Sequence, residues 1–122
     1  MYLLDNISYS VYKIDACNTD GGMVMECKEI SVRALKQKLF SEKEMQILDV
    51  REPDEYRSGH IEGSVPIPLR LLPYRTEEVN RNREVIVVCR SGNRSKEACH
   101  ILMERGFSNV KSLHGGLSSW TA

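Results

Sequence analysis

The fold is decided by the stretch Val85-Ile-Val-Val-Cys-Arg-Ser-Gly-Asn-Arg-Ser95. Its first four residues are all β-branched, as expected for a central strand that is covered on both faces. The glycine and asparagine near its end are residue types that favour turns. An apolar stripe at helical spacing comes next, formed by Ala98, Cys99, Ile101 and Leu102. This segment therefore predicts a buried strand, a loop that begins at Cys89, and a helix.

The rest of the chain from about Glu29 repeats this alternation of short apolar runs and amphipathic stretches. Ser31 is expected to cap a helix with apolar residues at helical spacing, namely Val32, Leu35 and Leu39. The run Met45–Val50 is predicted to be a second buried strand, and a further short strand is expected around Asn109–Leu113. Strands joined by helices in this way predict an α/β fold with a mostly parallel sheet.

Glycine and proline mark the boundaries between these elements. Pro53 suits the first turn of a helix, Gly59 and Gly63 bracket a turn, and Gly106 is expected to end the helix after the Cys89 loop. The stretch Val65–Pro68 contains two prolines, which cannot donate to a sheet ladder. It is therefore predicted to be an edge strand or a loop.

The chain is expected to form one domain over residues 28–122, preceded by an N-terminal extension over residues 1–27. The extension includes a turn-rich run, Asn18-Thr-Asp-Gly-Gly22, and is predicted to be an extra strand, a hairpin or a mobile terminus. Because the start lacks a basic leader and a long apolar run, we expect neither a secretory signal nor a membrane span, and a cytoplasmic location.

The overall composition excludes several classes of function. Seventeen basic residues balance seventeen acidic ones, so no net charge attracts nucleic acid or an anionic membrane, and neither is an expected partner. The four cysteines form no C-x-x-C pair and are interpreted as thiols. The three histidines, His60, His100 and His114, are widely scattered. We therefore expect no structural metal and no cofactor.

The loop after the central strand is the candidate site. In parallel α/β sheets, ligands bind beyond the carboxyl ends of the strands, where loop and helix amides lack backbone partners. Gly92 and Asn93 tolerate left-handed backbone angles, so the loop can turn its amides inward as an anion-binding nest. These amides, the helix dipole and the two arginines favour a thiolate at Cys89. The predicted nucleophile is Cys89, and the predicted binding residues are Arg90, Ser91, Gly92, Asn93, Arg94 and Ser95. The alternative is that Cys89 is only a small buried apolar residue.

Three blocks of sequence, in order between about Lys28 and Trp120, resemble the rhodanese-like family, and its single-domain sulfurtransferases most. The first is Leu48-Asp-Val-Arg-Glu-Pro-Asp-Glu-Tyr56 with Ser58-Gly-His-Ile-Glu-Gly-Ser64. The second is the Cys89–Ser95 loop. The third is Gly106-Phe with Leu113-His-Gly-Gly-Leu-Ser-Ser-Trp120.

This resemblance implies a five-stranded parallel sheet flanked by helices on both faces. It also implies a persulfide on Cys89, formed from thiosulfate or a related small sulfur-containing anion and passed to a thiol or to cyanide. Family members that act on sulfur have six residues from the cysteine to the arginine, as from Cys89 to Arg94, whereas related phosphatases and arsenate reductases have one more. The resemblance thus favours sulfur transfer over phosphatase or arsenate reductase activity. A sulfur-carrier or docking module that acts with a partner thiol protein is the alternative.

Several other residues have a structural and a functional interpretation. Asp49 and Arg51 follow the second predicted strand and are expected to support the site, although a local ion pair or a helix cap also explains Asp49. His60 and His114 are interpreted as turn residues with structural hydrogen bonds, and Trp120 as a packing residue. Cys99 is interpreted as a core thiol because its neighbours are apolar, with a resolving cysteine as the alternative. The roles of Cys17 and Cys27 are left open.

Overall fold

The computed structural model describes residues 26–41 and 44–120. The elements in chain order are β1 (Lys28–Ile30), α1 (Val32–Ser41), β2 (Met45–Asp49), α2 (Pro53–Arg57), β3 (Val65–Pro66), the 3-10 helices η2 (Leu69–Tyr74) and η3 (Thr76–Glu78), β4 (Glu84–Val88), α3 (Asn93–Glu104), β5 (Val110–Leu113) and the 3-10 helix η4 (Gly116–Ser119). The extra strand or hairpin predicted in the N-terminal extension lies outside the described residues. So does Cys17.

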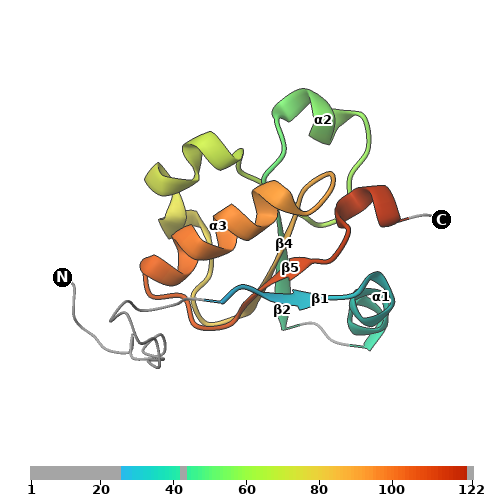
Figure 1. The fold of residues 1–122 in the computed structure, drawn as a ribbon, viewed down its shortest axis with the longest axis horizontal. Helices are drawn as coiled ribbons and strands as arrows, with labels where there is room; N and C mark the ends of the chain where they lie inside the picture. Colours follow the sequence, from blue (N-terminus) through green and yellow to red (C-terminus); the bar gives the residue numbers. More distant parts are fainter. Residues whose placement is uncertain (1–25, 42–43, 121–122) are drawn as a thin grey trace.

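The five strands form one parallel sheet in the order β1-β5-β4-β2-β3. Figure 1 shows the fold, with β1, β2, β4 and β5 labelled. β4 is the central strand, with Val87 opposite both Leu48 of β2 and Ser112 of β5. The predicted α/β class and the five-stranded parallel sheet are therefore confirmed. Since all strands run the same way, the carboxyl ends of β2, β4 and β5 meet at one edge of the sheet.

Side chains of β4 alternate between two hydrophobic cores on opposite faces of the sheet. Val85 and Val87 belong to the core that contains Ala98, Cys99 and Leu102 of α3. Ile86 and Val88 belong to the core that contains Leu35 of α1. These four apolar residues of β4 are fully buried, and each such side chain contributes about 1.5–3 kcal/mol on burial. The expected central strand with helices on both faces is confirmed.

The predicted helix boundaries agree with local capping interactions. The Ser31 hydroxyl accepts a hydrogen bond from the Ala34 backbone N–H at 3.0 Å, so it caps α1. Pro53 is the first residue of α2, where its missing N–H costs nothing. Gly106 follows α3 with a φ of +94°, a backbone conformation that glycine adopts without strain.

The proline-containing stretch forms the outer edge of the sheet, as predicted. β3 pairs with β2 through Val65 and Pro66, and the chain then leaves the sheet. The Ile67 backbone N–H still donates to the Asp49 carbonyl at 3.0 Å, which places the end of β2 beside this segment.

Within residues 26–41 and 44–120, the helices are too short or too polar to cross a membrane.

Candidate functional site

Cys89 directly follows β4 at the edge where the strand ends converge. Its neighbour Val88 lies opposite Asp49, the last residue of β2. The cysteine is only 1% exposed. Its position at the carboxyl end of the central strand is the one expected for a ligand site in this class of fold.

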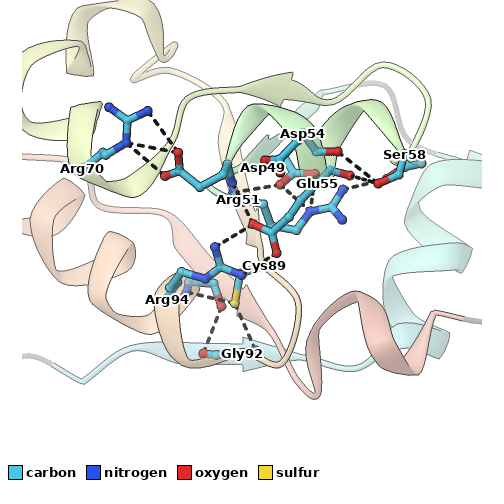
Figure 2. Close-up of polar contacts among 12 residues, drawn as sticks. Asp49, Arg51, Asp54, Glu55, Ser58, Arg70, Cys89, Gly92 and Arg94 are labelled. Atoms are coloured by element: carbon cyan, nitrogen blue, oxygen red, sulfur yellow. Dashed lines mark hydrogen bonds and ion pairs between the residues drawn. The ribbon is translucent and has the colours of Figure 1, made fainter.

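Two backbone amides point at the Cys89 sulfur, as Figure 2 shows in part. The Gly92 N–H donates to Sγ at 3.0 Å, and the Ser95 N–H donates to it at 3.3 Å. Gly92 has a φ of +108°, which turns the loop back toward Cys89 just before α3 begins. Ser95 lies in the first turn of α3, where backbone N–H groups lack helical partners. The arrangement stabilises negative charge on the sulfur.

A pair of buried serines ties the loop to β5. The Ser95 hydroxyl donates to the Gly92 carbonyl at 3.1 Å and lies 2.6 Å from the Ser112 hydroxyl. Both serines are fully buried. Ser112 therefore supports the amide that faces Cys89. This role was not predicted, because serine is mostly an exposed residue and nothing in its sequence context indicates a buried partner.

Arg94 is engaged by a carboxylate from α2. Its Nη1 and Nη2 donate to the Glu55 Oε1 and Oε2 at 2.9 and 3.0 Å, a bidentate pair. The Arg94 guanidinium, together with the Glu52 backbone N–H, lowers the pKa of Glu55 to about 2. Glu55 in turn raises the pKa of Arg94, and the nearby Cys89 acts in the same direction. Figure 2 shows this pair beside the Cys89 sulfur.

Glu55 itself is held by the capping of α2. The Glu52 backbone N–H donates to Glu55 Oε1 at 2.8 Å in a capping box that starts the helix. Glu55 was not predicted to be a site residue. An acidic side chain in the first turn of a helix after a strand end was the available signal, but it did not identify Arg94 as the partner.

Asp49 and Arg51 form an ion pair close to this helix. The Arg51 Nε and Nη2 donate to the Asp49 carboxylate at 3.0 and 2.9 Å, and Asp49 is fully buried. Asp49 raises the pKa of Arg51, and Arg51 Nη2 also donates to the Gly59 carbonyl at 2.8 Å. The pair therefore fixes the segment around α2 to the end of β2. It is the local ion pair that was predicted, beside a helix cap, as the alternative to support of the site.

The Gly115-Gly116 turn packs its backbone against the Cys89 loop. The Leu117 N–H donates to the Cys89 carbonyl at 2.7 Å, and the Ser118 N–H donates to the Arg90 carbonyl at 2.9 Å. A Cβ at Gly116 would lie 2.4 Å from that same Arg90 oxygen, so only glycine fits. The sequence predicted a turn here but not its contact with the loop.

The other predicted binding residues lie on the outside of the loop. Arg90, Ser91 and Asn93 are exposed, whereas Gly92 and Ser95 are buried. The structure thus brings Gly92, Ser95 and Cys89 together, and it places Arg94 on Glu55. The exposed side of the loop carries Arg90, Ser91 and Asn93.

The two histidines and the tryptophan make the local contacts expected of structural residues. His60 stacks on Tyr56, with ring centroids 3.7 Å apart, and its Nδ1 lies 2.8 Å from the Tyr56 carbonyl. His114 Nδ1 lies 3.1 Å from a Glu29 carboxylate oxygen. The Lys36 ammonium lies 4.9 Å from the Trp120 ring centroid.

Among the described residues, no three His, Cys, Asp or Glu side chains are grouped so that they could hold a metal.

Comparison with known proteins identifies the family. The model of the rhodanese-like domain matches residues 31–122. The chain belongs to the rhodanese-like family. It is similar to the sulfurtransferase of Allochromatium vinosum, with 37% identity over 92 residues that cover 75% of this chain and 86% of that protein. The rhodanese-like domain protein of Staphylococcus aureus has a similar structure, with a TM-score of 0.73, 32% identity, and coverage of 77% of this chain and 91% of that one.

A longer relative has a different name. The Bacillus subtilis protein named "Putative sulfur carrier protein YrkF" is 43% identical over 93 residues, which cover 76% of this chain. The match spans only 50% of that protein's length. In this rhodanese-like domain, the Cys89 sulfur has two backbone N–H donors and lies near the Arg94 guanidinium, in a loop held by hydrogen bonds from the Gly115-Gly116 turn. This geometry suits a nucleophile that accumulates negative charge.

Proposed function

We propose that this rhodanese-like protein is a sulfurtransferase that carries a sulfane sulfur as a persulfide on Cys89. The observation that carries the proposal is the pair of backbone N–H groups, from Gly92 and Ser95, directed at the Cys89 sulfur at the end of β4. These donors stabilise negative charge on the sulfur, and a negatively charged sulfur is the attacking group in exchange at sulfur. Family membership and the names of relatives support the same reaction class.

In the first half-reaction, the Cys89 thiolate attacks the outer sulfur of thiosulfate. A new S–S bond forms at Cys89, the S–S bond of thiosulfate breaks, and sulfite leaves with the bonding electron pair. The outer sulfur of the persulfide then bears the negative charge. The loop amides and the Arg94 guanidinium are the groups that stabilise this charge and attract the anionic donor.

In the second half-reaction, a thiolate or cyanide attacks the outer sulfur of the persulfide. The bond to the Cys89 sulfur breaks, the Cys89 thiolate is regenerated, and the product is a new persulfide or thiocyanate. No cofactor takes part in either step. The proposed acceptors include small thiols and thiol proteins, and the proposed compartment is the cytoplasm.

A sulfur-carrier role with a dedicated partner protein is the second candidate. The name of the Bacillus subtilis relative favours it, and the loop geometry serves a carrier as well as a turnover enzyme. The two roles differ in the second half-reaction. Slow transfer to cyanide and glutathione with saturable transfer to one protein indicates a carrier, whereas rapid transfer to small acceptors indicates an enzyme.

Intact-mass analysis tests the proposal. After incubation with thiosulfate, the chain is expected to gain one sulfur, and peptide mapping should locate it on Cys89. The Cys89→Ser variant should gain none, and the Cys99→Ser variant should still be loaded, provided that circular dichroism shows it folded. Loaded protein is then mixed with cyanide, glutathione or a thioredoxin-like protein. Loading of Cys89→Ser, or hydrolysis of an aryl phosphate without any sulfur loading, would overturn the assignment.

A further inference from the structure

Two thiols outside the Cys89 loop are brought together by the fold. Cys27 immediately precedes β1 and is half-buried, whereas Cys99 is fully buried in α3. The Cys27 side chain packs against the hydrophobic core that contains Cys99. The Cys27 thiol donates to the Lys28 carbonyl at 3.5 Å. The sulfur-transfer reaction proposed above uses neither Cys27 nor Cys99.

The two thiols have different chemical environments. The neighbouring Cys99 thiol lowers the pKa of Cys27. The Lys96 ammonium and a backbone group of Ser112 act in the same direction, whereas burial and Glu29 oppose them. The neighbouring Cys27 thiol and burial raise the pKa of Cys99. Cys27 is therefore the more reachable and more easily ionised thiol, and Cys99 is its protonated neighbour. This is the usual division between an attacking and a resolving thiol.

We propose that Cys27 and Cys99 form a reversible disulfide when the protein meets a low-molecular-weight disulfide. The Cys27 thiolate attacks one sulfur of the oxidant, whose S–S bond breaks and releases one thiolate, leaving a mixed disulfide on Cys27. The Cys99 sulfur then attacks the Cys27 sulfur. The second half of the oxidant leaves with the bonding electrons and takes up the Cys99 proton. The protein is oxidised by two electrons, and the small disulfide is reduced to two thiols.

The location of the pair gives this modification a structural consequence. β1 is an edge strand of the sheet, held by its pairing with β5. Cys99 lies one helical turn after Ser95, whose backbone N–H faces the Cys89 sulfur. The disulfide would therefore connect the sheet edge covalently to the helix that supports the Cys89 loop. A cross-link of this kind restricts the unfolded chain, so the oxidised form should resist urea more strongly than the reduced form.

The experiment uses the full-length Cys89→Ser variant, which removes the loop thiol from the chemistry. The reduced protein is treated without oxygen with oxidised glutathione and, in parallel, with the smaller hydroxyethyl disulfide. The expected product has lost two hydrogens, carries no adduct, and yields one cross-linked peptide pair containing Cys27 and Cys99. Dithiothreitol should restore the starting mass, and the oxidised form should show a higher urea midpoint.

Two matched variants separate the roles of the thiols. With Cys99→Ser added, Cys27 should keep the mixed disulfide, because no resolving thiol remains. With Cys27→Ser added, Cys99 should stay unmodified; circular dichroism verifies that both variants are folded. The proposal is overturned if Cys27 keeps an adduct while Cys99 is present, if Cys27 pairs with Cys17, or if neither oxidant reacts. Because Cys89 is absent throughout, these outcomes are independent of the sulfurtransferase assignment.

Discussion

The contact between the C-terminal glycine turn and the Cys89 loop leads to a quantitative prediction for Gly116→Ala. Gly116 has a φ of +65°. An added Cβ would lie 2.4 Å from the Arg90 carbonyl oxygen, 2.5 Å from the Arg90 carbonyl carbon and 2.7 Å from the Ser91 nitrogen. All three atoms are backbone, so a side-chain rotation cannot relieve the overlap. The turn must move away from the loop.

The expected loss in the free energy of unfolding has two sources. A non-glycine residue in the left-handed region costs about 1 kcal/mol. Moving the turn weakens the hydrogen bonds from Leu117 to the Cys89 carbonyl and from Ser118 to the Arg90 carbonyl, and each contributes about 1 kcal/mol. We therefore expect Gly116→Ala to lose about 3 kcal/mol. Because these two hydrogen bonds hold the Cys89 loop against the turn, sulfur loading should also slow in protein that remains folded.

Gly63→Ala is the matched control, since Gly63 has a φ of +87° and an added Cβ there would have no atom within 4 Å. It should cost only the backbone contribution of about 1 kcal/mol and leave sulfur loading at the wild-type rate. Urea denaturation measures the stabilities, and intact-mass time courses with thiosulfate measure the loading. Equal stability losses in the two variants, with wild-type loading in Gly116→Ala, would refute this account of the turn.

Three further variants test the interactions around the loop. Glu55→Gln should lose about 0.5–1 kcal/mol near neutral pH, because its pair with Arg94 is partly exposed. The pKa of Glu55 is lowered to about 2 from 4.5. The difference in free energy of unfolding between the wild type and Glu55→Gln should therefore be complete above pH 4.5 and disappear as the pH falls toward 2 in acid titrations. A difference that does not depend on pH would contradict this. Asp49→Ala leaves the Arg51 guanidinium, which is 10% exposed, without its carboxylate partner. It should lower the free energy of unfolding by about 3 kcal/mol in urea denaturation. A loss smaller than that of Glu55→Gln would argue against a structural role for Asp49. Ser112→Ala removes the buried contact between the Ser112 and Ser95 hydroxyls and should cost about 1 kcal/mol in the free energy of unfolding. Slower sulfur loading would indicate that the loop amide has moved. Unchanged loading would show that Ser112 stabilises the fold but does not position that amide.

Much of the framework could be predicted because it depends on local patterns. The β-branched run before Cys89 predicted the central strand, and its burial on both faces followed from the absence of polar residues in it. Ser31, Pro53 and Gly106 marked helix ends correctly, because capping and backbone preferences act within a few residues. The inward-facing loop amides were predicted from Gly92 and from the start of a helix.

The partners of these residues were decided only by the tertiary structure. Glu55 meets Arg94, Ser112 meets Ser95, and Cys27 meets Cys99 across gaps of 17 to 72 residues in the chain. A sequence read alone cannot choose among many acidic, hydroxyl or thiol side chains at such separations, because the choice depends on strand order and helix placement. The amino-acid sequence by itself determined a strand, a Cys89 loop and a helix. The order β1-β5-β4-β2-β3 decided which distant side chains surround that loop, because parallel pairing brings the ends of separate strands to one edge.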